Sequence, residues 1–215
     1  MNLTLSELPV LERYKLLIGL VIPRPIGWVS TWNENGVANC APFSFFNCIS
    51  EDPPLCILSF NSRTDGAMKH SLKNIHRTGE YVVNLVDEST ANAMHISSYE
   101  IPETESEFAK TGLTPVPSTR VKHPRIGEAA AAFECKIERI IKFGPERELV
   151  IGEILLVHAR EGIVDAHGDE LMPPRSVEPH ELAILEESHA CILAAHANQR
   201  SAVSLGRVRR HEPDH

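Results

Sequence analysis

Two short segments combine small, hydroxyl-bearing and aromatic residues in a way that suits a flat ring ligand. The first covers residues 28–31 (WVST) and the second covers residues 39–47 (NCAPFSFFN). A flat heteroaromatic ring needs apolar walls, while backbone N–H groups and side-chain amides address its polar edge. The same mixture occurs in strands that only pack within a sheet. Taken alone, the two segments leave a ring site and ordinary sheet packing open.

A third segment, residues 62–71 (SRTDGAMKHS), carries the groups that bind phosphate. Hydroxyl donors, a guanidinium, an ammonium and the start of a predicted helix all fall within ten residues. The alternative is a helix N-cap at Ser62, Thr64 or Asp65 followed by a solvated charged turn. Both interpretations remain open on the residues themselves.

Widespread nucleotide and hydrolase motifs are absent from the chain. It has no phosphate-binding G-x-x-x-x-G-K-[ST] loop and no G-x-G-x-x-G dinucleotide fingerprint. It also lacks the G-x-S-x-G nucleophile elbow and the H-E-x-x-H zinc motif. Among the eleven histidines, His180, His189 and His196 invite a metal hypothesis, but no carboxylate or thiol set of suitable spacing accompanies them. We therefore predict solvent-facing histidines, no metal site and no nucleophilic hydrolase.

The elements that would position these segments are mainly strands, with helices at the periphery. Apolar and β-branched runs predict six strands, at 26–32, 37–46, 55–60, 81–86, 131–143 and 148–159. Helical spacing predicts helices at 4–18, 67–77 and 88–99, with Gly79 supplying a stop after the second. Residues 102–124 read as a long polar connection with four prolines.

The composition is that of an ordinary globular protein, with 42% hydrophobic and 23% charged residues. The formal net charge of -8 argues against a nucleic-acid partner, because phosphates repel an acidic surface. The sequence has no apolar run of membrane-spanning length and no signal-peptide pattern at its start, so we expect a cytoplasmic protein without membrane association. The five cysteines form no metal motif and read as small apolar fillers.

A long ordered block of sequence resembles the flavin reductase family. PRPIGWVST at 23–31 is followed by G-x-x-N-x-A-P-F-S-F-F-N at 36–47 and by ISEDPP at 49–54. KHSLKNI-x-x-TGEYVVNLV follows at 69–86. The resemblance extends over about residues 12 to 170, and chance agreement over such a block is implausible.

The resemblance implies a six-stranded Greek-key FMN-binding split β-barrel and a homodimer with FMN at the subunit interface. Carried over by position, the residues that would line the isoalloxazine and ribityl chain are Ser30, Thr31, Ala41, Pro42, Phe43, Ser44 and Asn47. Those that would hold the phosphate are Ser62, Arg63, Lys69 and Ser71.

The chain departs from the family pattern at two places. Lys69-His70-Ser71 stands where relatives usually have Lys-Asp-Thr, so an imidazole replaces a carboxylate. Nothing after Met172 matches the closing Arg-Leu-Gly-Gly and Tyr segment of the family. We accordingly divide the chain into a flavin reductase-like domain at 1–177 and an atypical tail at 178–215, predicted to be a marginal helix followed by a disordered end.

The resemblance and the binding segments together predict an NAD(P)H-dependent flavin reductase that supplies reduced flavin, with a monooxygenase as a possible recipient. Hydride transfer to FMN obliges no side chain to act as acid or base, so no catalytic residue is assigned. Two alternatives remain: an FMN-binding electron carrier without steady NAD(P)H turnover, and a flavin-free split barrel kept for protein interaction.

Overall fold

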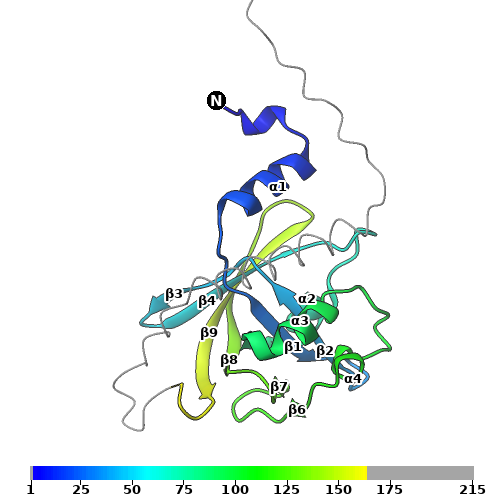
Figure 1. The fold of residues 1–215 in the computed structure, drawn as a ribbon, viewed down its shortest axis with the longest axis vertical. Helices are drawn as coiled ribbons and strands as arrows, with labels where there is room; N and C mark the ends of the chain where they lie inside the picture. The colour runs from blue at the N-terminus through cyan, green and yellow to red at the C-terminus, as the bar shows by residue number, and fades with distance from the viewer. Residues whose placement is uncertain (1, 164–215) are drawn as a thin grey trace, which may run out of the picture.

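A seven-stranded antiparallel sheet forms the body of the computed structural model, which describes residues 2–163 (Figure 1). The strand order is β2-β1-β5-β8-β9-β4-β3, and a separate two-stranded ribbon pairs β6 with β7. The strands are β1 Gly27–Trp32, β2 Ala38–Phe43, β3 Phe46–Glu51, β4 Pro54–Asn61, β5 Glu80–Leu85, β6 Pro115–Val116, β7 Arg125–Ile126, β8 Ala131–Lys142 and β9 Arg147–Ala159. The α-helices are α1 Val10–Leu20, α2 His70–Thr78, α3 Ala91–Ile96 and α4 Glu107–Thr111. Two 3-10 turns precede α1 and α3, at Leu5–Glu7 and Glu88–Thr90.

The sheet curls because its two edge strands follow one another directly in the chain. β2 ends at Phe43 and β3 starts at Phe46, yet the two strands lie at opposite ends of the strand order. Three Cα steps span at most about 11 Å, so the two edges must approach one another. The mainly β, split-barrel prediction is confirmed in this arrangement.

The prediction of six strands was wrong by one, and β3 is the additional strand of the main sheet. The sequence predicted one continuous strand over 37–46, but the chain breaks at Ser44 and Phe45 and changes partner. Before the break β2 pairs with β1, and after it β3 pairs with β4. The break is fixed where the backbone N–H of Ser59 on β4 donates to the carbonyl of Phe45 at 2.9 Å.

Two apolar clusters cover the two faces of the central strands. Val29 of β1 packs inside the barrel with Leu58, Phe60 and Tyr81, while α2 adds apolar side chains to the same cluster. Its neighbour Trp28 points to the other face and packs against α3 and α4. Successive residues of a strand face opposite sides, so the apolar run in β1 supplies both clusters.

The predicted helices differ from the observed ones mainly at their starts. α2 begins at His70, three residues later than expected, because residues 63–67 form a turn in which Gly66 adopts a positive φ of 82°. Its end is as predicted: Gly79 lies in the left-handed region and its N–H donates to the carbonyl of Ile75. The predicted connection at 102–124 contains α4 and β6, which its polar composition conceals.

The first helix leaves the body of the molecule, as the dark blue ribbon in Figure 1 shows. Among the residues that the structure describes, α1 buries only the side chain of Ile18. Arg24 caps the C-terminal end of α1, because its guanidinium donates to the carbonyls of Ile18 and Val21. Within residues 2–163, no helix is both long enough and apolar enough to cross a membrane. The predicted tail at 178–215 and its boundary lie outside the described residues.

Candidate functional site

Two adjoining hollows form a groove beside the turn between β2 and β3. The larger has a volume of about 740 Å³, including the part open to solvent, and the smaller has about 370 Å³. Both are lined by Ala41, Phe43, Lys69 and Ser98, so one continuous groove runs past these residues. The groove therefore brings together residues of the second segment (39–47) and of the third segment (62–71).

The larger hollow has apolar and aromatic walls with a cation at one side. Pro42, Phe43 and Phe45 line it, and Tyr14 reaches it from α1. The rings of Tyr14 and Phe45 meet edge to face at 6.4 Å between centroids. The Arg147 guanidinium lies 5.3 Å from the centre of the Phe45 ring and donates to the Ser59 hydroxyl at 3.1 Å. This geometry matches what a flat ring with a polar edge requires.

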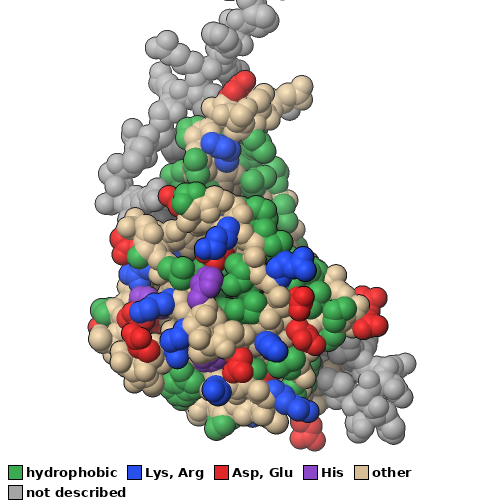
Figure 2. All heavy atoms as spheres, turned by 180° about the vertical axis from the view of Figure 1, so that it is seen from behind, with side chains coloured by type: hydrophobic (Ala, Val, Ile, Leu, Met, Phe, Trp, Pro, Cys, Tyr) green, Lys and Arg blue, Asp and Glu red, His purple; other side chains and the backbone are tan. Residues whose placement is uncertain are grey.

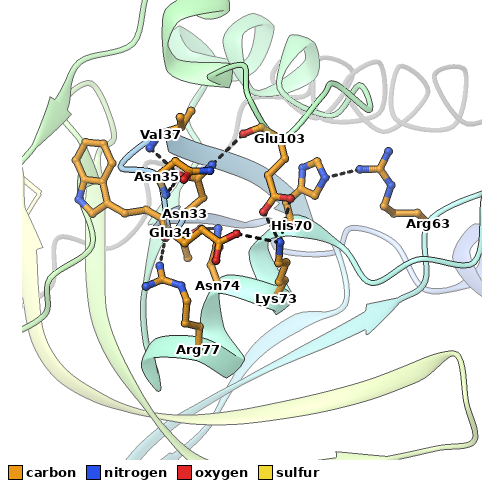
Figure 3. A network of polar contacts seen from close by, with 12 residues as sticks. Asn33, Glu34, Asn35, Val37, Arg63, His70, Lys73, Asn74, Arg77 and Glu103 are labelled. Atoms are coloured by element: carbon orange, nitrogen blue, oxygen red, sulfur yellow. Dashed lines mark hydrogen bonds and ion pairs between the residues drawn. The ribbon is translucent and has the colours of Figure 1, made fainter.

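The smaller hollow lies at the start of α2 and contains both cations and two carboxylates, Glu100 and Glu107. Arg63, Lys69, His70 and Ser71 all line it. Arg63 Nη1 lies 2.7 Å from His70 Nε2, as Figure 3 shows. Burial and the Arg63 charge lower the pKa of His70, so the imidazole is the neutral acceptor in this pair. His70 thus holds Arg63 without neutralising its charge.

Arg63, which lines this hollow, has one buried nitrogen that makes no hydrogen bond. Among the described residues, Arg63 Nε makes no hydrogen bond although solvent does not reach it. The nearest carboxylate oxygen recorded for it belongs to Asp65, at 3.6 Å, which is beyond hydrogen-bond distance. A buried N–H without an acceptor is costly, so the Arg63 guanidinium has hydrogen-bonding capacity that the described residues do not use.

A buried carboxylate, Glu107 of α4, supports the floor of the smaller hollow. Its Oε2 accepts from Asn39 Nδ2 at 3.0 Å and from the Cys40 backbone N–H at 3.2 Å. Asn39 Oδ1 in turn accepts from the hydroxyls of Ser71 and Thr31, at 2.9 and 3.3 Å. Burial raises the pKa of Glu107, against the hydrogen bonds that the carboxylate accepts. The Ser71 hydroxyl is therefore oriented by residues from three separate segments.

A polar network fastens the loop after α3 to α2 and to the turn between β1 and β2. The Lys73 ammonium lies 2.9 Å from Glu103 and 3.8 Å from Glu34. Asn33 donates through its side-chain amide to the Glu103 carbonyl at 2.9 Å. These contacts tie the β1–β2 turn, α2 and the loop together, as the dashed lines in Figure 3 show.

The structure brings seven of the eleven predicted binding residues to the groove. They are Ala41, Pro42, Phe43, Ser44, Arg63, Lys69 and Ser71. The other four do not line it.

Ser30 and Thr31 are fully buried, and Asn47 is exposed on β3. The Ser30 hydroxyl donates to the Pro124 carbonyl at 2.6 Å, and Thr31 accepts from Asn74 at 3.0 Å. Ser62 lies beside Glu146, whose carbonyl accepts from its backbone N–H at 3.0 Å. Ligand contact by these four residues stays a prediction.

Sequence reasoning missed Tyr14, Asn39, Glu100, Glu107 and Arg147 as groove residues. Asn39 lies inside a segment that had been singled out, so its amide was a usable signal. The others come from segments whose local pattern carries no sign of a site. No group of three or more His, Cys, Asp or Glu side chains within residues 2–163 is arranged to hold a metal ion. The three histidines considered for one lie beyond this range.

Comparison with known proteins identifies the family. The family model described as "Flavin reductase like domain" matches residues 19–172. An uncharacterized protein of Aquifex aeolicus is 45% identical over 152 residues, covering 71% of this chain and 77% of the relative. The uncharacterized protein YwrF of Bacillus subtilis is 39% identical over 197 residues, covering 87% and 96%.

Two solved structures are similar in both sequence and fold. The 2-nitrobenzoate 2-nitroreductase of Pseudomonas fluorescens is 36% identical, with a TM-score of 0.72 over 80% of this chain and 82% of that protein. Nitrilotriacetate monooxygenase component B from Bacillus cereus is 33% identical, with a TM-score of 0.74 over 77% and 84%. The curled sheet and the groove at the β2–β3 turn agree with these matches. The chain therefore belongs to the flavin reductase-like domain family.

Proposed function

We propose that this protein is an FMN-dependent oxidoreductase that takes hydride from NAD(P)H and delivers reduced flavin. The observation that carries the proposal is the continuous groove, with aromatic walls at one end and two cations at the start of α2 at the other. Membership of the flavin reductase-like family agrees with it.

The groove residues fit FMN in their chemistry. The Arg63 guanidinium, the Lys69 ammonium and the first turn of α2 suit a phosphate dianion. The backbone and side chains of Pro42, Phe43 and Ser44 suit the ring system. Bound FMN would supply two-electron chemistry, accepting a hydride and passing the electrons on.

The protein's own part in this reaction is to bind and orient. Arg63 and Lys69 would hold the phosphate, which fixes the position of the ring in the larger hollow. Within the described residues, no carboxylate pairs with Arg147, so its charge can interact with negative charge on a flavin ring or on a second substrate. The hollow is open to solvent, which allows a nicotinamide to enter without a dinucleotide-binding domain of its own.

The electron acceptor is proposed from the similar structures. The likeness to a monooxygenase component B favours a monooxygenase as recipient of reduced flavin. The likeness to a 2-nitrobenzoate 2-nitroreductase favours a second candidate, direct reduction of a nitroaromatic acid at the flavin. Arg147, beside the Phe45 ring, is a suitable partner for the carboxylate of such a compound.

An absorbance spectrum of the purified full-length protein, taken with FMN before and after anaerobic NADH or NADPH, tests the function. We expect the spectrum of bound FMN, and we expect at least one of NADH and NADPH to bleach its absorbance. Bleaching by dithionite alone would favour the electron carrier, and failure to bind FMN would favour the flavin-free interaction protein. Adding 2-nitrobenzoate to the reduced protein without oxygen then separates the two candidate acceptors. Reoxidation of the flavin supports direct reduction of the nitroaromatic acid, and a flavin that stays reduced favours delivery to a monooxygenase.

We also propose a homodimer, because several large apolar side chains are exposed within the part of the chain that the structure describes. Val10 is 74% exposed, Leu20 is 71% exposed and Phe143 at the tip of the β8–β9 hairpin is 58% exposed. Figure 2 shows hydrophobic side chains gathered over the upper part of the molecule, where α1 projects. Apolar patches of this kind mark interfaces in soluble proteins.

Light scattering at micromolar concentration measures the oligomeric state. We expect a mass of about 48 kDa, twice the mass of one chain, in keeping with the prevalence of two-fold symmetric dimers. A second measurement on Leu20→Lys, which places a charge in the exposed patch, is expected to shift the mass toward 23.9 kDa. A wild-type mass of one chain would contradict the proposal.

A further inference from the structure

Glu100 places a carboxylate among the same donors that are proposed to hold the FMN phosphate. It follows α3 and lines the smaller hollow together with Arg63 and Lys69. Its Oε1 lies 3.1 Å from the Lys69 ammonium, and its Oε2 accepts from the Thr64 hydroxyl at 3.0 Å. Arg63 Nη2 lies 3.8 Å from the same Oε2. One carboxylate is therefore in contact with the two cations and a hydroxyl of the third segment.

Glu100 is an anion in this position. Partial burial alone would raise its pKa, but Lys69, Thr64 and Arg63 together lower the pKa below its usual value. The carboxylate therefore carries a full negative charge at neutral pH. Its negative charge therefore already compensates part of the positive charge of Lys69 and Arg63 before any ligand binds.

The donors of the hollow cannot serve Glu100 and a phosphate equally well. A phosphate dianion needs the Lys69 ammonium and the Arg63 guanidinium at hydrogen-bond distance. Glu100 stays within reach of both groups, and like charges at such separations repel strongly in a partly buried site. A phosphate must therefore either displace the carboxylate or bind beside it at a cost.

The loop around Glu100 is fastened on both sides. Before it, the Ser97 hydroxyl is buried and accepts from Trp28 Nε1 at 2.9 Å. After it, Glu103 pairs with Lys73 and accepts from Asn33 through its carbonyl. Since the backbone is anchored at both ends, a side-chain rotation of Glu100 is the simplest way to vacate the cations.

We infer that Glu100 is an internal counter-ion that competes with the phosphate of the flavin and so sets how strongly the site distinguishes FMN from riboflavin. This inference rests on the proposed function, because it assigns a residue to the hollow that is proposed to hold the FMN phosphate. It makes Glu100 a specificity-determining residue, with no part in electron transfer.

Flavin titration of the full-length protein with Glu100→Gln tests the inference. Gln retains the size and a hydrogen-bonding oxygen but removes the charge. We expect the Kd for FMN to fall roughly tenfold and the Kd for riboflavin, which has no phosphate, to change less than about twofold. Fluorescence quenching of the flavin gives both constants without any measurement of activity.

Glu105→Gln is the matched control, because it removes the same charge from the same loop. Glu105 is exposed and pairs with Lys110, and neither residue lines a hollow. We expect this variant to leave the preference for FMN over riboflavin unchanged. An FMN affinity that is unchanged or weakened in Glu100→Gln, or a gain of equal size in Glu105→Gln, would overturn the inference.

Inorganic phosphate provides a second probe that does not depend on flavin binding. Isothermal titration is expected to show tighter phosphate binding to Glu100→Gln, and to a second variant, Glu100→Ala, than to the wild type. If the wild type binds neither flavin, the proposed function fails while the phosphate measurement still decides the inference. Equal phosphate affinity in the wild type and both variants would reject it.

Discussion

Replacing Arg63 by alanine is expected to weaken FMN binding by ~1.5 to 3 kcal/mol, the range for loss of a charge-assisted hydrogen bond. This corresponds to a Kd that rises roughly 10- to 150-fold. The guanidinium is held by His70 at 2.7 Å and keeps one buried N–H without an acceptor. The contact with His70 holds the guanidinium in place before any ligand binds, so little ordering cost offsets its contribution.

Riboflavin separates a phosphate contact from a general loss of the site. Because riboflavin has no phosphate, its affinity is expected to change much less than that of FMN in Arg63→Ala. Arg139→Ala is the charge-matched control, since Arg139 is exposed on β8 and lines neither hollow. Fluorescence titration of both flavins measures the effect. Equal losses for the two ligands would remove Arg63 from the phosphate site.

The sheet was predictable because its strands carry their own signals. β4, β5 and β9 are rich in apolar and β-branched residues, which fit a buried pleated surface whatever their neighbours are. β3 was missed for the opposite reason: four of its six residues are exposed and its identity depends on pairing with β4. The end of α2 was predictable because Gly79 supplies a left-handed residue, which is a local property.

The candidate site was predictable only where its residues lie in one continuous stretch of sequence. Ala41 to Ser44 and Arg63 to Ser71 are contiguous in sequence, so their chemistry is visible as a motif. Glu100 and Arg147 reach the groove only through the packing of distant elements, and no local pattern marks them. Ser30 fails to line the groove because β1 lies between β2 and β5 with both faces covered. A hydroxyl in a motif shows its chemistry but not the face on which it lies.

Replacing Glu107 by alanine is expected to lower the free energy of unfolding by about 2 to 4 kcal/mol. The carboxylate is buried, and its removal leaves Asn39 Nδ2 and the Cys40 N–H without the acceptor that both now share. Each buried donor without a partner costs about 1 to 3 kcal/mol. Because Asn39 orients the Ser71 hydroxyl, FMN affinity is expected to fall in the same variant.

Glu107→Gln separates the hydrogen bonds from the charge, because a Gln carbonyl can accept from both donors. Burial raises the pKa of Glu107 above its unfolded value, so the wild type loses stability as pH rises through the folded pKa. Gln does not ionise and avoids this loss. Urea unfolding at pH 5 and pH 8 measures the effect. The free energy of unfolding of Glu107→Gln, relative to the wild type, is expected to be higher at pH 8 than at pH 5. Glu107→Ala is expected to be less stable than Glu107→Gln at both pH values. Equal stability of the Ala and Gln variants would show that the two donors find other acceptors, and that Glu107 does not hold the floor of the hollow.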